Sequence, residues 1–349
     1  MLKIAEYAKH HIPEVHKYDS EKYIKERRHQ LMDAGVANAM SAMAKHKSSN
    51  CRELLAGVYL VLAEEVENRG KLVAAGGGKA LIPLALEGSE VGKTKASQAL
   101  AKIAISINPE LAFPGQRSLE LIRPLIRNLH PDKSELEHYE ALMALTNMAS
   151  GDSSVRKRII KEQGISNIEQ YMFCEDDDLR RAGTECICNL VKDEDCLFIY
   201  EKPDNDRVKL LVLYCGEDDL GLNIAASGAL AQLTNSSDKI CERIAGLTAF
   251  ATTFKQAACA ANIEVQYRIF YIIRNIAVTS KELCTKIVES DLTEVIVALT
   301  RIDVEKDRAK VKEIATEIVK LFLEHELIKP TYAGLEGIMK DDTALKEDA

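Results

Sequence analysis

Apolar positions recur along this chain at helical spacing, and the same apolar pattern returns about every 42 residues. Apolar residues three and four positions apart predict helices with one buried face. A helix pair of this kind cannot bury its apolar face alone, so neighbouring units must stack. Six segments align on this register; they begin at Leu60, Leu100, Leu145, Ile187, Leu230 and Ile273.

A period in the forties indicates armadillo or HEAT repeats. We therefore predict an all-α fold, an armadillo-repeat right-handed superhelix of about six repeats of about 42 residues. The predicted domains are partial or capping helices in 1–50, the repeats in 51–330 and a polar tail in 331–349. The repeats themselves are expected at 52–88, 92–131, 135–176, 178–218, 220–262 and 264–303, followed by a last helix from Ala309 to His325.

The joints between repeats carry acidic runs and one irregular segment. Residues 175–178 and 217–219 are acidic and precede helices expected at Leu179 and Leu220. Carboxylates there cap free N–H groups; a cation site is the alternative, but no calcium-binding loop pattern is present. Residues 108–115 hold two prolines and a glycine, which predicts a fixed loop rather than a helix.

Charge and composition exclude several classes of protein. The net charge is −8 with both signs mixed along the chain, which argues against a nucleic-acid partner. No apolar run of about 18 residues exists to span a membrane, and the first residues lack the apolar core of a signal peptide. Nine cysteines lie scattered in apolar segments, so we expect reduced core thiols in a cytoplasmic protein.

No motif for catalysis, cofactor or metal binding stands out. Residues 88–94 imitate a phosphate-binding loop, but only three residues separate the glycines, so a helix-to-helix turn is the better interpretation. A nucleotide hydrolase using Lys93 is thus a weak hypothesis. Glycines 76–78 predict a turn with left-handed backbone. The histidines form no ligand pattern. We expect no enzyme, no cofactor and no metal.

Amides repeat at the third position of four aligned segments, 42, 43 and 43 residues apart: Asn147, Asn189, Gln232 and Asn275. In armadillo stacks the last helix of each repeat lines the concave wall. Amides there could pair with the main chain of an extended peptide, or they could brace adjacent repeats. One or two turns earlier on the same helices lie further candidate groove residues: Tyr139, Met143, Arg181, Glu185, Arg268 and Tyr271.

These neighbours also have structural interpretations. Tyr139 and Tyr271 could anchor an apolar ligand chain, and Met143 could adapt to an irregular surface or simply pack in the core. For Arg181 and Arg268 the alternative is an ion pair between repeats.

Residues 140–147, 180–190, 206–214, 216–219 and 113–117 resemble the UCS domain of the myosin-directed chaperones. The resemblance implies an armadillo domain that binds the myosin motor head through its groove, prevents its aggregation and assists folding and filament assembly, without hydrolysing ATP. It also implies a cytoplasmic, sarcomere-associated protein. Hsp70 and Hsp90 are implied as partners of full-length members, through a tetratricopeptide domain that this sequence does not show. Tyr139 and Asn147 stand in the matching motif.

The alternative function is an armadillo peptide-binding adaptor of another class, of the nuclear-transport or scaffold type. Nuclear-transport grooves combine the amides with tryptophans, and this chain has none.

Overall fold

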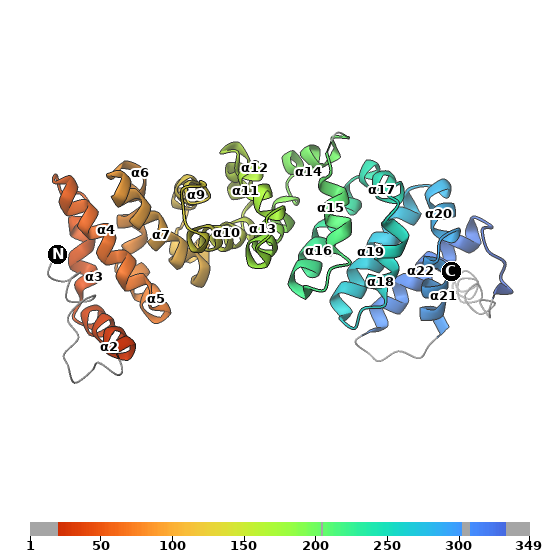
Figure 1. Cartoon of the computed structure of the whole chain (residues 1–349), viewed down its shortest axis with the longest axis horizontal. Helices are drawn as coiled ribbons and strands as arrows, with labels where there is room; N and C mark the ends of the chain where they lie inside the picture. The colour runs from red at the N-terminus through yellow and green to blue at the C-terminus, as the bar shows by residue number, and fades with distance from the viewer. Residues whose placement is uncertain (1–19, 204, 302–307, 333–349) are drawn as a thin grey trace, which may run out of the picture. The chain divides into compact units, whose positions relative to one another are not determined.

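The computed structural model describes residues 20–203, 205–301 and 308–332. Every regular element among them is a helix, as predicted. The chain divides into two compact units, Met1–Leu190 and Val191–Ala349. Figure 1 shows the helices of each unit following one another in chain order. The predicted domain boundaries at residues 50 and 330 stay predictions, and most of the predicted tail lies outside the described residues.

The first unit contains α2 to α13. Their bounds are α2 (Ser20–Asp33), α3 (Val36–Met43), α4 (Ser49–Ala63), α5 (Val66–Ala74), α6 (Gly77–Glu87), α7 (Glu90–Ser106), α8 (Pro109–Ala112), α9 (Gln116–Arg127), α10 (Glu135–Ser150), α11 (Ser153–Lys161), α12 (Gly164–Met172) and α13 (Asp177–Leu190). The long helices α4, α7, α10 and α13 pack each against the next. Helices α2 and α3 pack on α4, α5 and α6.

The second unit contains α14 to α22. Their bounds are α14 (Glu194–Glu201), α15 (Arg207–Tyr214), α16 (Leu220–Ser236), α17 (Asp238–Ala245), α18 (Phe250–Ala258), α19 (Ile263–Thr279), α20 (Lys281–Val288), α21 (Leu292–Arg301) and α22 (Ala309–Glu324). Here α16, α19 and α22 are the long helices that pack in succession. The last helix is the one that its apolar face predicts, with Ile318 and Phe322 fully buried.

Each repeat therefore has one long helix followed by two shorter ones. The long helices bury small and branched side chains, such as Ala99, Leu100 and Ile103 of α7. Small residues at these positions let the helix backbones approach closely, which suits a chain with 5% aromatic residues. The sequence analysis expected the amides on the last helix of each repeat. With the predicted repeat bounds they lie on the first helix. The difference depends only on where a repeat is said to begin, because the stack of helices is continuous.

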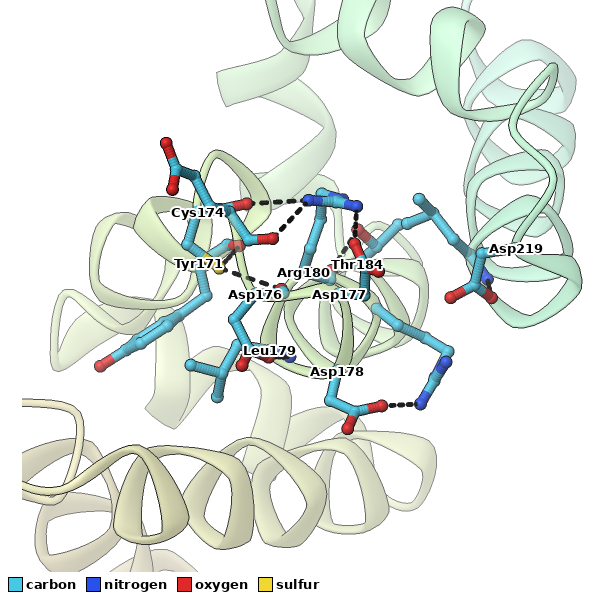
Figure 2. A network of polar contacts seen from close by, with 12 residues as sticks. Tyr171, Cys174, Asp176, Asp177, Asp178, Leu179, Arg180, Thr184 and Asp219 are labelled. Atoms are coloured by element: carbon cyan, nitrogen blue, oxygen red, sulfur yellow. Dashed lines mark hydrogen bonds and ion pairs between the residues drawn. The ribbon is translucent and has the colours of Figure 1, made fainter.

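Acidic residues cap the long helices, as the sequence predicts. The Asp176 carboxylate accepts the Leu179 N–H at 2.8 Å, and that of Asp219 accepts the Leu222 N–H at 3.0 Å. Helix α13 begins at Asp177, two residues before the predicted start. Figure 2 shows the next two carboxylates of the run, those of Asp177 and Asp178. Asp177 pairs with Arg180 and Asp178 with Arg181, both on the same helix. These contacts favour capping over a cation site.

Three other segments were predicted to be turns or loops. Of the three glycines 76–78, Gly76 has the predicted left-handed backbone, with a φ of 82°, whereas Gly77 and Gly78 already belong to α6. Only Gly88 and Ser89 form the turn between α6 and α7, and residues 90–94 are already the first turn of α7, where Ser89 caps the helix and Lys93 pairs with Glu90 at 2.8 Å. The prediction for residues 108–115 was partly wrong, since Asn108 caps the single helical turn α8.

Candidate functional site

Six candidate residues lie on two neighbouring long helices of the first unit. Helix α10 carries Tyr139, Met143 and Asn147, and α13 carries Arg181, Glu185 and Asn189. Each set has a spacing of four, so its members share one side of their helix. All six side chains are half-buried, and α10 packs directly against α13. We call these six residues the α10–α13 face.

The amides of this face contact the preceding helix. The Asn147 side-chain nitrogen donates to the carbonyl oxygens of Ala104 and Ile105 in α7, at 3.1 and 2.9 Å. Asn189 repeats the contact one layer on, donating to the Thr146 carbonyl at 3.1 Å. These bonds cap carbonyl groups at or near the ends of the long helices. The amide nitrogens thus brace adjacent repeats, and a groove ligand could meet Asn147 only at its oxygen.

The two amides of the second unit differ. The Asn275 nitrogen donates to the Thr234 hydroxyl in α16 at 3.1 Å, and the residue is only 7% exposed. Gln232 donates to the Gly228 carbonyl of its own helix, at 3.1 Å. Asn275 therefore also braces two layers and offers little surface to a ligand.

Lys102 in α7 occupies the register position that the amides hold in other repeats. The sequence analysis did not select it, because it considered only amides at this position. Its side chain is 9% exposed, and its ammonium nitrogen lies 2.5 Å from Glu140 and 3.3 Å from Glu64. Glu140 belongs to α10, whereas Glu64 follows α4, so Lys102 joins three successive layers. The alignment of Lys102 with the amides could have identified it from the sequence.

The arginine candidates form ion pairs within their own helices. Arg181 pairs with Asp178, and Arg268 pairs with Glu264 at 2.5 Å. Both of these ion pairs lie within one helix, whereas the alternative offered by the sequence was an ion pair between repeats. Arg268 also donates to the Ile224 carbonyl of α16, which is a contact between repeats. Ion pairs within a helix were favoured by the three- and four-residue spacing.

Tyr271 lies beside a second tyrosine that the sequence analysis did not select. The rings of Tyr267 and Tyr271 stack with centroids 6.3 Å apart, and the Tyr271 hydroxyl donates to Asn235 at 2.8 Å. Both rings border a cavity of about 400 Å³ between α19 and α22, with Arg274 and Glu317 on its rim. The spacing of four between the tyrosines indicates this pair. We call this cavity the α19–α22 pocket.

The thiols only partly follow the prediction. All nine cysteines are free, and five are buried, but Cys259 is exposed. Burial raises the pKa of Cys186 to about 12 and that of Cys284 to about 11. These buried thiols are therefore protonated at neutral pH and act as small apolar groups.

One group of potential metal ligands occurs among the described residues, formed by His29, Glu65 and Glu67. Glu65 pairs with Arg28 at 2.6 Å, and Glu67 pairs with Lys25 at 2.9 Å. Cations of the chain already neutralise both carboxylates, so the group does not indicate a metal centre. In the described parts of the chain, no helix has the length and apolar content needed to cross a membrane.

Comparison with known proteins identifies relatives of this chain. No family model matches it. The chain is 41% identical over 335 residues to human "Protein unc-45 homolog B", which covers 95% of this chain and 36% of that protein. It thus spans about a third of the length of the curated relatives it matches.

Two solved structures agree with this result. UNC-45 from Drosophila melanogaster is 42% identical with a TM-score of 0.85, over 94% of this chain and 42% of that chain. The myosin chaperone UNC-45 from C. elegans, in complex with a Hsp90 peptide, is 35% identical with a TM-score of 0.81, over 90% of this chain and 35% of that chain. Both are armadillo-like helical repeat proteins, which confirms the predicted fold class. By sequence and by fold, this chain is homologous to the part of the UNC-45 proteins that it matches.

Proposed function

We propose that this chain is the client-binding part of a myosin-directed chaperone. It binds the myosin motor domain, prevents its aggregation and assists its folding and its assembly into filaments. The observation that carries the proposal is the match to UNC-45 proteins over nearly the whole chain, together with a half-buried face of mixed chemistry on α10 and α13. The chain acts by binding, without catalysing a reaction and without a cofactor.

The α10–α13 face suits a partly folded client. Tyr139 and Met143 offer apolar surface one turn apart, and Arg181 and Glu185 on the next helix offer charges of both signs. A partly folded motor domain exposes apolar side chains together with unpaired polar groups. Methionine adapts to irregular apolar surfaces, and a tyrosine ring contributes contact area with a polar end. Single contacts of this kind are weak, so capture requires several of them.

The second unit contributes a separate surface at the α19–α22 pocket. Tyr267 is 37% exposed, and its ring stacks with that of Tyr271 above a rim of paired charges. We propose that this pocket holds an apolar client side chain. The amide nitrogens of Asn147, Asn189 and Asn275 bond to groups within the repeats, which weakens the alternative of an adaptor that reads peptide main chains.

Partners beyond the client belong to the longer protein. A relative has been solved with a Hsp90 peptide, and we propose that a full-length protein containing this chain works with Hsp90 and Hsp70. The proposed location is the cytoplasm, with sarcomere association in muscle.

The test is the thermal aggregation of a myosin motor fragment, followed by light scattering. The wild-type chain should suppress scattering, and the variant Tyr139→Ala/Met143→Ala should suppress it much less at the same molar ratio. Phe198→Ala is the matched control, because it removes an aromatic ring that is 64% exposed elsewhere in the chain. All variants must first show similar melting temperatures. If both variants suppress scattering as well as the wild type does, capture takes place on another surface. If the wild type itself does not suppress scattering, the chaperone function is contradicted.

A further inference from the structure

A cavity of about 850 Å³ lies in the first unit, next to the α10–α13 face. The irregular segment Asn108–Gly115, singled out in the sequence, forms one of its walls together with the first turn of α9. The end of α10 and the start of α11 form another, with Asn147 and Asp152 among the lining residues. Phe113 is fully buried beneath the segment and fixes it in place. This cavity is therefore built by an interruption of the repeat.

The charged side chains that line the cavity are both acidic, Glu110 and Asp152. A Glu110 carboxylate oxygen lies 3.4 Å from the point where a Cβ on Gly151 would stand, so the two carboxylates share one rim. Hydrogen bonds from Ser154 are the main cause of a lowered pKa for Asp152, which is therefore charged at neutral pH. Arg156 donates to the carbonyls of Ala149 and Gly151 at 3.0 and 2.5 Å. The charge of Arg156 also lowers the pKa of Asp152, but Arg156 does not line the cavity. The charged groups of the lining itself are the two carboxylates, which favour a positive ligand group.

Other lining groups fit a long side chain with a polar end. Ile107, Leu119 and Val155 provide apolar wall. The nitrogen of Asn147 is engaged by α7, so the group that Asn147 can offer to the cavity is its oxygen, an acceptor. An apolar wall beside several acceptors suits an aliphatic stem that carries a cationic head.

The first turn of α9 adds donors at the cavity. Gly115 precedes it with a φ of 65°, and no side chain caps the helix. Uncapped N–H groups at a helix start can donate to a carbonyl oxygen. A ligand with a main-chain carbonyl as well as a cationic side chain uses both the α9 donors and the acidic rim. These features match a polypeptide better than a free cation.

We propose that this cavity binds an arginine or lysine side chain of an extended polypeptide, with the cationic head against Glu110 and Asp152. The inference deepens the proposed client capture and rests on it for the identity of the polypeptide. It adds a charge-specific subsite to an otherwise mixed surface.

The test uses a capped pentapeptide with a central arginine flanked by glycines, titrated into the whole chain while backbone amide NMR signals of Gly115 and Gly151 are followed. The matched probes replace the arginine with citrulline, its uncharged analogue, or with glutamate. The arginine peptide should shift both signals, and its binding should weaken with added salt. The citrulline and glutamate peptides should bind much more weakly.

Two variants test the rim. Glu110→Gln and Asp152→Asn should each raise the Kd of the arginine peptide about three- to five-fold, and together about ten-fold. Asparagine caps helices as well as aspartate does, so α11 should stay intact. Glu120→Gln, which removes an exposed carboxylate of α9 outside the cavity lining, should leave the Kd unchanged.

Three outcomes would overturn the inference: no binding of the arginine peptide, equal binding of the citrulline peptide, or an unchanged Kd in the double variant. Tighter binding of the glutamate peptide than of the arginine peptide would also overturn the inference. It would indicate that the cavity binds anions through the N–H groups at the start of α9. If the arginine peptide does not bind but the chain still suppresses aggregation of the motor fragment, the proposed function stands without this subsite. Peptide binding without protection would reject the client function and keep the subsite.

Discussion

The side-chain nitrogen of Asn147 lies 2.9 Å from the carbonyl oxygen of Ile105, across the boundary between two repeats. The same nitrogen also reaches the Ala104 carbonyl, so one amide satisfies two groups near the end of α7. Lys102 and Asn189 make related contacts at the same register position. This position therefore joins layers, whatever else the α10–α13 face binds.

Replacing Asn147 with alanine should lower the free energy of unfolding by about 1–2 kcal/mol, because two carbonyl groups lose their donor. Asn167→Ala is the control, since the Asn167 amide bonds only to the Gln163 carbonyl just ahead of its own helix, at 3.0 Å. Asn167→Ala should lower the free energy of unfolding by less than Asn147→Ala does. Urea unfolding followed by far-UV circular dichroism measures both. An Asn147→Ala variant as stable as wild type would show that the amide does not brace the repeats.

The Lys102–Glu140 pair provides a second test of bracing. Lys102→Met removes the cation but keeps an apolar stem, and it should cost about 2 kcal/mol because Glu140, 13% exposed, loses its partner. The double variant Lys102→Met/Glu140→Gln should lose less than the single one. A double-mutant cycle in urea measures the coupling. Strictly additive losses would mean that the two residues do not interact.

Thiol reactivity should separate the cysteines by exposure. Cys259 is exposed, whereas burial raises the pKa of Cys186 to about 12 and that of Cys284 to about 11. A disulfide reagent such as DTNB at neutral pH should modify Cys259 fastest, and Cys259→Ser should remove that fast phase. Buried thiols should react only in denaturant. The half-buried thiols of Cys51, Cys174 and Cys188 should react at intermediate rates. Fast modification of any of the five buried thiols without denaturant would contradict their described burial.

Stability should fall in acid partly through Glu162. Hydrogen bonds from Arg123, at 3.1 Å to each carboxylate oxygen, are the main cause of its lowered pKa. A carboxyl group whose pKa is lower in the folded state contributes stability above its unfolded pKa of about 4.3 and loses it as the pH falls through the folded value. Glu162→Gln should therefore cost stability at pH 6 and much less at pH 3. Urea midpoints at both pH values measure this, with Glu120→Gln as control; equal costs at both would refute it.

The repeat was predictable because the spacing of apolar residues along the sequence shows both the helical periodicity and the fixed register. The positions of α7, α10, α13, α16 and α19 follow from that register, and the acidic caps follow from local chemistry. The direction of the Asn147 amide does not, since it depends on how closely α10 approaches α7. The cavity beside Glu110 depends on the path of residues 108–115, which no period describes. Lys102 was overlooked because its residue type differs from the amides, although its contacts are equivalent.

The central claim is that the α10–α13 face captures a myosin motor domain. The most direct measurement places a photoreactive benzophenone amino acid at Met143 in one variant and at Phe198 in another, and irradiates each with the motor domain during mild heating. The account predicts a covalent adduct with the motor domain from position 143 and little from position 198. An adduct from position 198 alone, or from neither position while the chain still suppresses aggregation, would contradict it.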